Sequence, residues 1–443
     1  MSDKMAGLNH KQLDAHWMPY TGNREFKKNP RLIVAAKGNY LTSADNRQVF
    51  DGLSGLWTCG LGHCRPEITE AISKQAAQVD YVPAFQYGTP MSFQLAEKIT
   101  QFMPEGLNRV MFTGSGSESV ETSLKIARAY WRKKGQPSKT KLIGRSLGYH
   151  GVNWGGMSVG GIGGNRIAFG LGIDADHMRN TMLPENTFVK GQPENGAERA
   201  NDLLDLIALH DASNIAAVIV EPMSGSAGVI PPPKGYLNRL REICDQHNIL
   251  LIFDEVITAF GRVGAKTGSE AFGVTPDIIT MAKQLTNAAI PMGAVVSKQS
   301  IYDTFMENAG PDYLPEISHG YTYSAHPIAC AAGLASLKLL EQEQLPQRVK
   351  EMSPYFENAV HSLKGCKHIT DIRNMGFAAG FTLEAGPESP MQRTFSIAMR
   401  MWEKGFYVRC GGATIQLAPS FITEKSEIDA LINALGETIN EQE

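Results

Sequence analysis

The sequence predicts an α/β fold, in which a large domain built on a mostly parallel sheet is joined to a smaller α+β domain. In the middle of the chain the apolar runs are continuous, which is typical of strands covered on both faces. Stretches with helical spacing separate these runs, as in chains that form parallel sheets. The two ends of the chain alternate between apolar and polar residues, and this pattern predicts the smaller domain.

In chain order, the first predicted element is a hairpin over residues 31–51 that turns at Ala44-Asp45-Asn46. Residues 109–113 are predicted to form the first strand of the large sheet. The stretch after it has apolar residues every three or four positions, which predicts a helix. The residues on its apolar face are Val120, Leu124, Ala127 and Trp131.

The same alternation of strand and helix then returns. Strand Ile215–Val220 is followed by a second helical pattern and by a strand at residues 249–253. Further strands are predicted at Ile278–Met281 and at residues 293–297. The apolar side of the second helix carries Tyr236, Leu240, Ile243 and Cys244.

The C-terminal part begins with a long apolar helix at residues 328–340, which we expect to carry the chain from one domain to the other. Strands at residues 377–383 and at Thr414–Leu417 follow it. We therefore predict that residues 56–327 form the large domain. Residues 1–55 and 328–443 would together form the small one.

Composition limits the partners of this protein. Its 443 residues include 42 Lys and Arg against 45 Asp and Glu, so no basic surface for nucleic acid is expected. The N-terminus lacks the apolar segment of a secretory signal, and no apolar run approaches the roughly 20 residues that span a bilayer. Six thinly spread cysteines are typical of reduced proteins. We expect a cytoplasmic protein with small-molecule partners and no membrane contact.

One group of residues has the composition of a metal site. Cys59, His63 and Cys64 lie close together, but no second pair follows at zinc-ligand spacing. We therefore expect small buried thiols here and no metal.

Polar residues follow four of the predicted strands. Ligands of parallel sheets bind beyond the carboxyl ends of the strands, so these positions are where chemistry is expected. They are the loop 114–117 after the first strand, Glu221, Asp254 and Lys283. A possible phosphate cradle, two acids and an amine would thus meet at one edge of one sheet.

The loop contains Ser115, Gly116 and Ser117 at the start of a helix, where free backbone N–H groups and the helix dipole favour a phosphate. Ordinary N-capping by serine is the alternative interpretation.

Lys283 follows a core strand, where burial lowers the pKa of its amine and makes it a nucleophile that can form an imine with an aldehyde. Such an imine is the resting state of enzymes that use pyridoxal phosphate (PLP). Asp254 could keep the pyridine nitrogen of PLP protonated.

At these residues the chain resembles a known family. The segment Asp254-Glu255-Val256-Ile257-Thr258-Ala259-Phe260-Gly261-Arg262, with Thr280-Met281-Ala282-Lys283 further along, is similar to the signature of class III aminotransferases. The resemblance implies a PLP-dependent transferase of fold type I. Further matching segments, which spread it over most of the chain, are residues 112–118, Tyr149-His150-Gly151, Glu221-Pro222, Pro291-Met292-Gly293-Ala294 and Gly320-Tyr321-Thr322-Tyr323.

The resemblance implies roles for individual residues. Lys283 would hold PLP as a Schiff base, Asp254 would pair with its pyridine nitrogen, and Gly116 and Ser117 would hold its phosphate, with Ser115 beside them. These roles make Lys283 and Asp254 the expected catalytic residues.

Other cofactor contacts are implied in the same way. Tyr149 would stack on one face of the PLP ring and Val256 would pack on the other, with Glu221 nearby. Thr322 would reach the phosphate from a neighbouring subunit. The resemblance thus implies a homodimer, or a dimer of dimers, with shared active sites.

Within the family, Leu56-Trp57 and residues 405–409 look most like the ω-amino acid–pyruvate (β-alanine–pyruvate) branch. Trp57 and Arg409 would then bind substrate, and the guanidinium of Arg409 would clamp a carboxylate. Relatives that use 2-oxoglutarate carry arginine at the position of Gln416, so its absence favours pyruvate. We predict a ping-pong transfer of the amino group of an ω-amino acid or primary amine to pyruvate, giving alanine and an aldehyde or semialdehyde.

Another PLP chemistry and two unrelated enzyme classes are the alternatives to transamination. A decarboxylase or an aminomutase would use the same PLP scaffold, and dependence on an added keto acid separates them from a transaminase. The segments 144–148 and 156–160 match the G-x-S-x-G elbow of serine hydrolases, but an elbow must open into a helix, and we expect residues 148–164 to be too rich in glycine to form one. A nucleotide hydrolase would need a G-x-x-x-x-G-K-[ST] loop, which the sequence lacks.

Overall fold

The computed structural model describes residues 7–170 and 172–442, and its largest sheet has seven strands. Neighbouring strands are parallel except where β10 pairs with β4 and with β9. In sheet order the strands are β4 (Leu107–Thr113), β10 (Gly293–Lys298), β9 (Ile278–Met281), β8 (Leu250–Asp254), β7 (Ile215–Val220), β5 (Lys141–Arg145) and β6 (Ala175–Met178). The predicted α/β class is confirmed, with one antiparallel strand inside the sheet.

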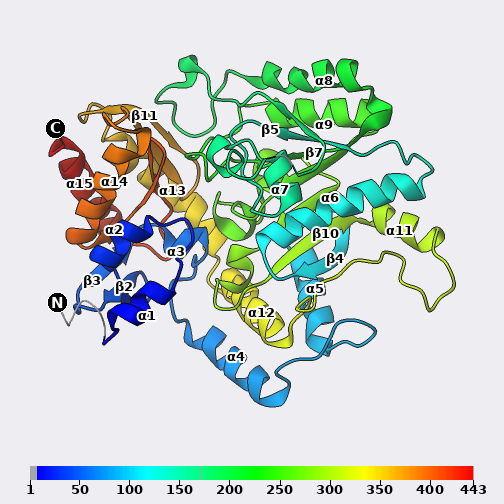
Figure 1. The fold of residues 1–443 in the computed structure, drawn as a ribbon, viewed down its shortest axis with the longest axis horizontal. Coiled ribbons are helices and arrows are strands. Elements are labelled where there is room, and N and C mark those ends of the chain that lie inside the picture. The colour runs from blue at the N-terminus through cyan, green and yellow to red at the C-terminus, as the bar shows by residue number, and fades with distance from the viewer. Residues whose placement is uncertain (1–6, 171, 443) are drawn as a thin grey trace.

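Helices cover both faces of this sheet (Figure 1). Ala217 and Ile219 of β7 belong to a buried cluster that includes the apolar face of α6, whereas Val218 and Val220 face a cluster that includes α9. The helices of this part are α4 (Pro66–Gln78), α5 (Pro90–Thr100), α6 (Gly116–Lys133), α7 (Trp154–Val159), α8 (Asp202–His210), α9 (Tyr236–Gln246), α10 (Gly268–Phe272), α11 (Gln299–Glu307) and α12 (Pro327–Gln342).

The N-terminal part contains two short helices, a meander and a helical turn. Strands β2 and β3 form the predicted hairpin, in which Asn46 N donates to Ser43 O at 2.8 Å across the turn. The elements are α1 (His10–Ala15), α2 (Asn23–Lys28), β1 (Ile33–Lys37), β2 (Tyr40–Ser43), β3 (Gln48–Asp51) and α3 (Ser54–Trp57).

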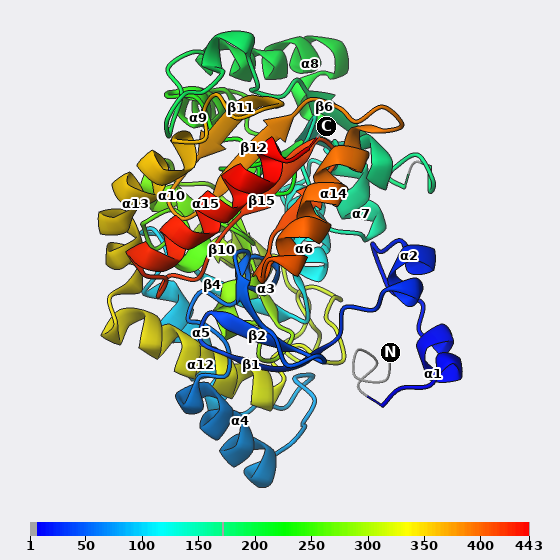
Figure 2. The same ribbon diagram turned by 90° about the vertical axis from the view of Figure 1, so that its left-hand side faces the viewer.

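The C-terminal part lies against this meander, as Figures 1 and 2 show. Strand β13 pairs in parallel with β3, with Phe406 opposite Phe50, and an antiparallel sheet has the order β11-β12-β15-β14. The elements are α13 (Leu345–His361), β11 (Ile369–Asn374), β12 (Ala379–Leu383), α14 (Pro390–Glu403), β13 (Phe406–Tyr407), β14 (Arg409–Gly411), β15 (Thr414–Leu417) and α15 (Lys425–Asn440). The two ends of the chain therefore share one sheet, while the boundaries at residues 55 and 327 stay a prediction.

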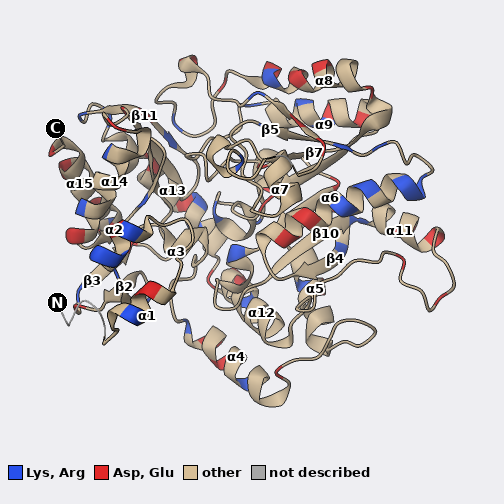
Figure 3. Ribbon diagram, viewed as in Figure 1, with Lys and Arg blue, Asp and Glu red and all other residues tan. Residues whose placement is uncertain are grey.

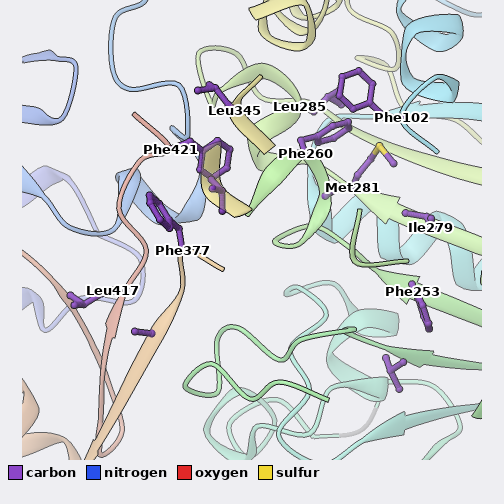
Figure 4. Close-up of a cluster of buried hydrophobic side chains, with 14 of the residues drawn as sticks. Phe102, Phe253, Phe260, Ile279, Met281, Leu285, Leu345, Phe377, Leu417 and Phe421 are labelled. Atoms are coloured by element: carbon purple, nitrogen blue, oxygen red, sulfur yellow. The ribbon is translucent and has the colours of Figure 1, made fainter. Parts of the chain in front are cut away.

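A continuous apolar core joins the two parts. Phe253 and Met281 of the large sheet belong to the same buried cluster as Phe377, Leu417 and Phe421 from the C-terminal part, as Figure 4 shows. This packing holds β14 and β15 beside the carboxyl end of the large sheet.

Figure 3 shows Lys and Arg interspersed with Asp and Glu along the surface helices, including α4, α6, α8 and α9. Within residues 7–170 and 172–442, no helix is both long and apolar enough to cross a membrane.

Candidate active site

The predicted residues meet at one edge of the large sheet. Strands β4, β7, β8 and β9 run in one direction, so their carboxyl ends lie on the same side. Asp254 is the last residue of β8, Glu221 directly follows β7, and Lys283 begins the 3₁₀ turn η7 (Lys283–Thr286) after β9. Asp254 and Glu221 both act electrostatically on the Lys283 amine. The edge thus combines two carboxylates with a lysine.

The loop after β4 opens directly into α6. Ser115 is the N-cap residue, and its hydroxyl accepts a hydrogen bond from Glu118 N at 3.2 Å. The first backbone N–H groups of α6, at Gly116 and Ser117, have no partner within the helix and suit an anion. A Cβ on Gly116 would lie 3.1 Å from both methyl groups of Val256, so the loop packs closely on Val256 and a larger residue would push against it.

Gly151 packs against this loop. Its φ of 90° lies in the left-handed region, and a Cβ there would be 2.5 Å from Ser117 Oγ. The next residue, Val152, donates its N–H to Ser117 Oγ at 3.2 Å. The segment that carries Tyr149 and His150 is thereby fastened to the start of α6.

Asp254 is held by three hydrogen bonds. Its Oδ2 lies 2.8 Å from His150 Nδ1, and its Oδ1 accepts from Thr280 Oγ1 at 3.1 Å and from Val256 N at 3.2 Å. Asp254 is 5% exposed and His150 1% exposed. The carboxylate is therefore fixed in one orientation in a water-poor site.

The sequence alone indicates no role for His150 or Thr280. His150 directly follows Tyr149 in a matching segment, which was the available signal for it. Thr280 lies opposite Asp254 on the neighbouring strand, a relation that only strand register could reveal.

Lys283 has an amine adapted to nucleophilic chemistry. Burial lowers its pKa from 10.5 to about 8, while the negative charges of Asp254 and Glu221 oppose this shift and Arg409 and Arg262 reinforce it. An amine with a pKa near neutrality is partly unprotonated at physiological pH and can serve as nucleophile, base or acid.

Glu221 braces the backbone around the site. One of its oxygens accepts from Tyr149 N at 2.9 Å and the other from Gly225 N at 3.0 Å. Burial raises the pKa of its carboxyl group, and the charge of Asp254 adds to the effect.

Burial also raises the pKa of Tyr149 to about 12, with a further contribution from the phenol of Tyr20. The N-terminal segment therefore reaches the site through Tyr20, for which the sequence offered no signal.

Arg409 enters the site from the C-terminal sheet. It acts electrostatically on both Lys283 and Tyr149, and its Nε is buried without a hydrogen-bond partner among the described residues. Its partner across β14 and β15 is the buried Gln416, whose Nε2 donates to Ser226 O at 2.9 Å. A guanidinium with an unused donor thus stands opposite a neutral amide.

Trp57 and Thr322 lie in different surroundings. Trp57 is 3% exposed and packs in an apolar cluster with Met223 and Ile257, which follow β7 and β8. Thr322 is exposed in the loop between α11 and α12, where its carbonyl accepts from Tyr81 OH at 2.9 Å. Trp57 is therefore anchored next to the strand ends, whereas Thr322 faces outward from this chain.

The expectation that residues 148–164 form no helix was wrong, because α7 covers Trp154–Val159. Met157 and Val159 are buried there, and tertiary packing outweighs the low helix propensity of glycine. Ser158 lies inside α7 and donates to Trp154 O at 2.6 Å, so it is a packed helix residue and not a nucleophile on a turn.

The expectation of buried thiols near His63 holds for Cys59 but is wrong for Cys64, which is exposed. Cys64 has a φ of 53°, and this left-handed turn carries its side chain outward. All six cysteines are free thiols. Among the residues that the structure describes, no group of three His, Cys, Asp or Glu side chains could hold a metal ion.

The site fits PLP. The start of α6 suits the phosphate of PLP, and the space that a Cβ on Gly116 would fill suits a face of its ring. The Lys283 amine, with its lowered pKa, suits the aldehyde, and the fixed carboxylate of Asp254 suits the pyridine nitrogen. The unpaired Nε of Arg409 leaves one strong donor for a substrate anion.

Known proteins share both this sequence and this fold. The chain is 59% identical over 429 residues to the β-alanine–pyruvate aminotransferase of Pseudomonas aeruginosa, covering 97% of this chain and 96% of that protein. It is 57% identical over 431 residues to the ω-amino acid–pyruvate aminotransferase of Pseudomonas putida, with coverage of 97% and 96%.

A solved amine transaminase from an uncultivated Pseudomonas species, with PLP bound, superposes with a TM-score of 0.89 at 34% identity, covering 96% of this chain and 98% of that one. The (S)-enantioselective ω-transaminase of Thermomicrobium roseum gives a TM-score of 0.91 at 31% identity, with 97% of each chain covered. The family model of class III aminotransferases matches residues 21–439. The chain is an enzyme that belongs to the class III aminotransferases.

Proposed function

We propose that this enzyme uses PLP to transfer the amino group of an ω-amino acid or a primary amine to pyruvate. PLP, when bound, supplies the aldehyde that takes up the amino group and the ring that accepts electrons. The observation that carries the proposal is the buried Lys283 amine, on which both the fixed carboxylate of Asp254 and the guanidinium of Arg409 act electrostatically.

In this proposal each residue has a distinct task. The Lys283 amine holds the cofactor and later moves the proton at the donor carbon, for which a pKa of about 8 is suitable. Asp254 keeps the pyridine nitrogen protonated, and His150 fixes the Asp254 carboxylate. Gly116 and Ser117 bind the phosphate, with Ser115 capping the same helix.

The remaining residues would set orientation. Tyr149 and Val256 would hold the cofactor ring between them, and Glu221 fixes the backbone of Tyr149. Trp57 borders the donor.

The acceptor follows from the charges around the site. A dicarboxylate needs two cationic partners, whereas Arg409 lies opposite the neutral Gln416. Arg262, the other guanidinium that acts electrostatically on Lys283, donates to Phe377 O, Pro419 O and Ser54 Oγ and is 1% exposed. One available guanidinium favours a monocarboxylate such as pyruvate, in agreement with the names of the relatives in the two Pseudomonas species.

We further infer a homodimer in which Thr322 of each chain reaches the phosphate of the neighbouring site. Thr322 lies on a surface of exposed aromatic residues, and a contiguous apolar surface favours a protein partner. These residues are Tyr81, Phe85, Tyr87, Phe93 and Tyr323. Sedimentation of the enzyme at decreasing concentration, with activity measured in parallel, tests whether dissociation and loss of activity coincide.

The decisive test combines labelling with a substrate screen. Borohydride reduction of the PLP-loaded enzyme should attach the cofactor to Lys283, as peptide mapping would show. Alanine should form only when both an amino donor and pyruvate are present. Label on another lysine, or turnover of an amino acid without any keto acid, would reject transamination through Lys283.

A further inference from the structure

Two residues of the site have a strained backbone. Trp57 has a φ of 65° and Lys283 a φ of 43°. Residues other than glycine hold such left-handed conformations only where surrounding contacts impose them, and such positions cluster at functional sites. The two residues are linked through the short segment after Trp57, which is hydrogen-bonded at residues 60–62 to the turn that begins with Lys283.

The turn that begins with Lys283 grips the chain segment that follows Trp57. Gln284 Oε1 accepts from Gly60 N at 2.6 Å. Asn287 binds residues 61 and 62 through both the oxygen and the nitrogen of its side-chain amide. Asn287 Oδ1 accepts from Leu61 N at 3.0 Å and its Nδ2 donates to the carbonyl of residue 62 at 2.8 Å. We call Gln284 and Asn287 the amide clamp.

The clamp is rigid and dry. Gln284 is 4% exposed and Asn287 is 5% exposed. The backbone carbonyl of Gln284 accepts from Ser336 Oγ of α12 at 3.0 Å, which ties the turn to the core. A Cβ on Gly60 would lie 2.5 Å from the ring of Phe421, so the gripped segment has no room to move on its other side.

We propose that the amide clamp is a positioning device that sets Trp57 relative to the Lys283 amine and thereby determines which amino donors fit. The inference rests on the proposed function, because Trp57 matters only if the donor binds beside Lys283. Each clamp bond satisfies a buried backbone group that water cannot reach. Loss of one bond would therefore loosen residues 60–62, and we expect Trp57, only three residues before Gly60, to shift with them.

The test uses the PLP-loaded enzyme and two donors, β-alanine and 1-phenylethylamine, whose aromatic ring needs the space beside Trp57. Gln284→Met removes the acceptor for Gly60 N at similar volume. Asn287→Asp keeps a side chain that tolerates a left-handed backbone but removes the Nδ2 donor. In each variant we expect the ratio of kcat/KM for the two donors to change about tenfold, the effect of one buried hydrogen bond. Amide hydrogen exchange of residues 57–62 should accelerate.

Matched controls come from the same chain. Gln75→Met removes a buried amide that donates to Val79 O just after α4, and Asn248→Asp alters an asparagine with a φ of 51° outside the site. Both should leave the donor ratio unchanged. Gln284→Glu keeps an acceptor for Gly60 N and should restore most of the ratio lost in Gln284→Met.

Equal loss for both donors, with hydrogen exchange at residues 57–62 unchanged, would overturn the proposal and leave the clamp a purely structural contact. An unchanged donor ratio in both Gln284→Met and Asn287→Asp would also overturn it. If wild-type enzyme transfers no amino group, the proposed function fails instead. Hydrogen exchange in the absence of substrate then still shows whether the clamp holds the segment.

Discussion

Replacement of Arg409 by alanine should separate carboxylate binding from the chemistry at Lys283. Arg409 lies half-buried on β14, and the Nε of its guanidinium is buried without a hydrogen-bond partner among the described residues. A donor that bears a carboxylate can supply the missing partner. An amine without a carboxylate has nothing to offer it.

The magnitude follows from the strength of such a pair. Loss of a charge-assisted pair costs about 2 to 4 kcal/mol in kcat/KM, which is roughly a 30- to 1000-fold loss for β-alanine. For 1-phenylethylamine the change should stay within a few-fold. Arg409 also helps to lower the pKa of Lys283, so in Arg409→Ala this pKa should rise above about 8.

The assay is a single turnover of the PLP-loaded enzyme with each donor and no acceptor, followed by absorbance of the bound cofactor. Omitting pyruvate matters, because its own carboxylate would otherwise report on Arg409 in both experiments. Arg409→Lys should recover part of the loss, and Arg400→Ala, which removes an exposed guanidinium paired with Glu403, is the control for general damage. Equal losses for the two donors would refute the carboxylate clamp.

Three further predictions concern the cofactor site. Asp254→Asn should leave the fold and PLP binding intact but lower turnover by several orders of magnitude, because an amide cannot keep the pyridine nitrogen protonated. Near-normal turnover in a steady-state assay would show that Asp254 has only a structural role. The lowered pKa means that the Lys283 amine is neutral above about pH 8, so the rate at which apoenzyme takes up PLP should rise with pH to a half-maximum near 8. A half-maximum near 10.5 in stopped-flow absorbance would contradict the burial of Lys283. Gly151→Ala forces a Cβ onto Ser117 and should weaken PLP binding about tenfold or more in an equilibrium titration, whereas Gly135→Ala, also at positive φ but in open space, should not.

The sequence was sufficient to predict much of the large sheet and the placement of its polar residues. Continuous apolar runs predicted the first and last residues of β7 and β9 correctly. A strand that is buried on both faces must be apolar along its whole length, so the ends of the apolar run mark the ends of the strand. Parallel direction then required Glu221, Asp254 and Lys283 to meet at one edge. The direction of β10 could not be predicted, because apolar periodicity is the same for both directions.

Contacts between segments that lie far apart in the sequence could not be predicted from the local pattern of apolar and polar residues. His150 and Asp254 are 104 positions apart, and nothing local to either residue encodes their pairing. The helix α7 was missed because its stability comes from burial of Met157 and Val159 and not from its own residues. The grip of Asn287 on Leu61 likewise depends on how two parts of the chain dock.

The parallel pairing of β13 with β3 has a consequence for how the enzyme matures. Phe406 pairs with Phe50, and Arg409 follows only three residues later, so the arginine reaches the site only after the last part of the chain has docked onto the first. Contacts of such large sequence separation form slowly, because the entropy of closing a long loop must be overcome first. During synthesis from the N-terminus, the sheet edge with Lys283 is complete before Arg409 exists. A nascent chain that ends before β13 would therefore carry Lys283 and the loop at the start of α6 without Arg409, and under the proposed function it could not select substrates by their carboxylate.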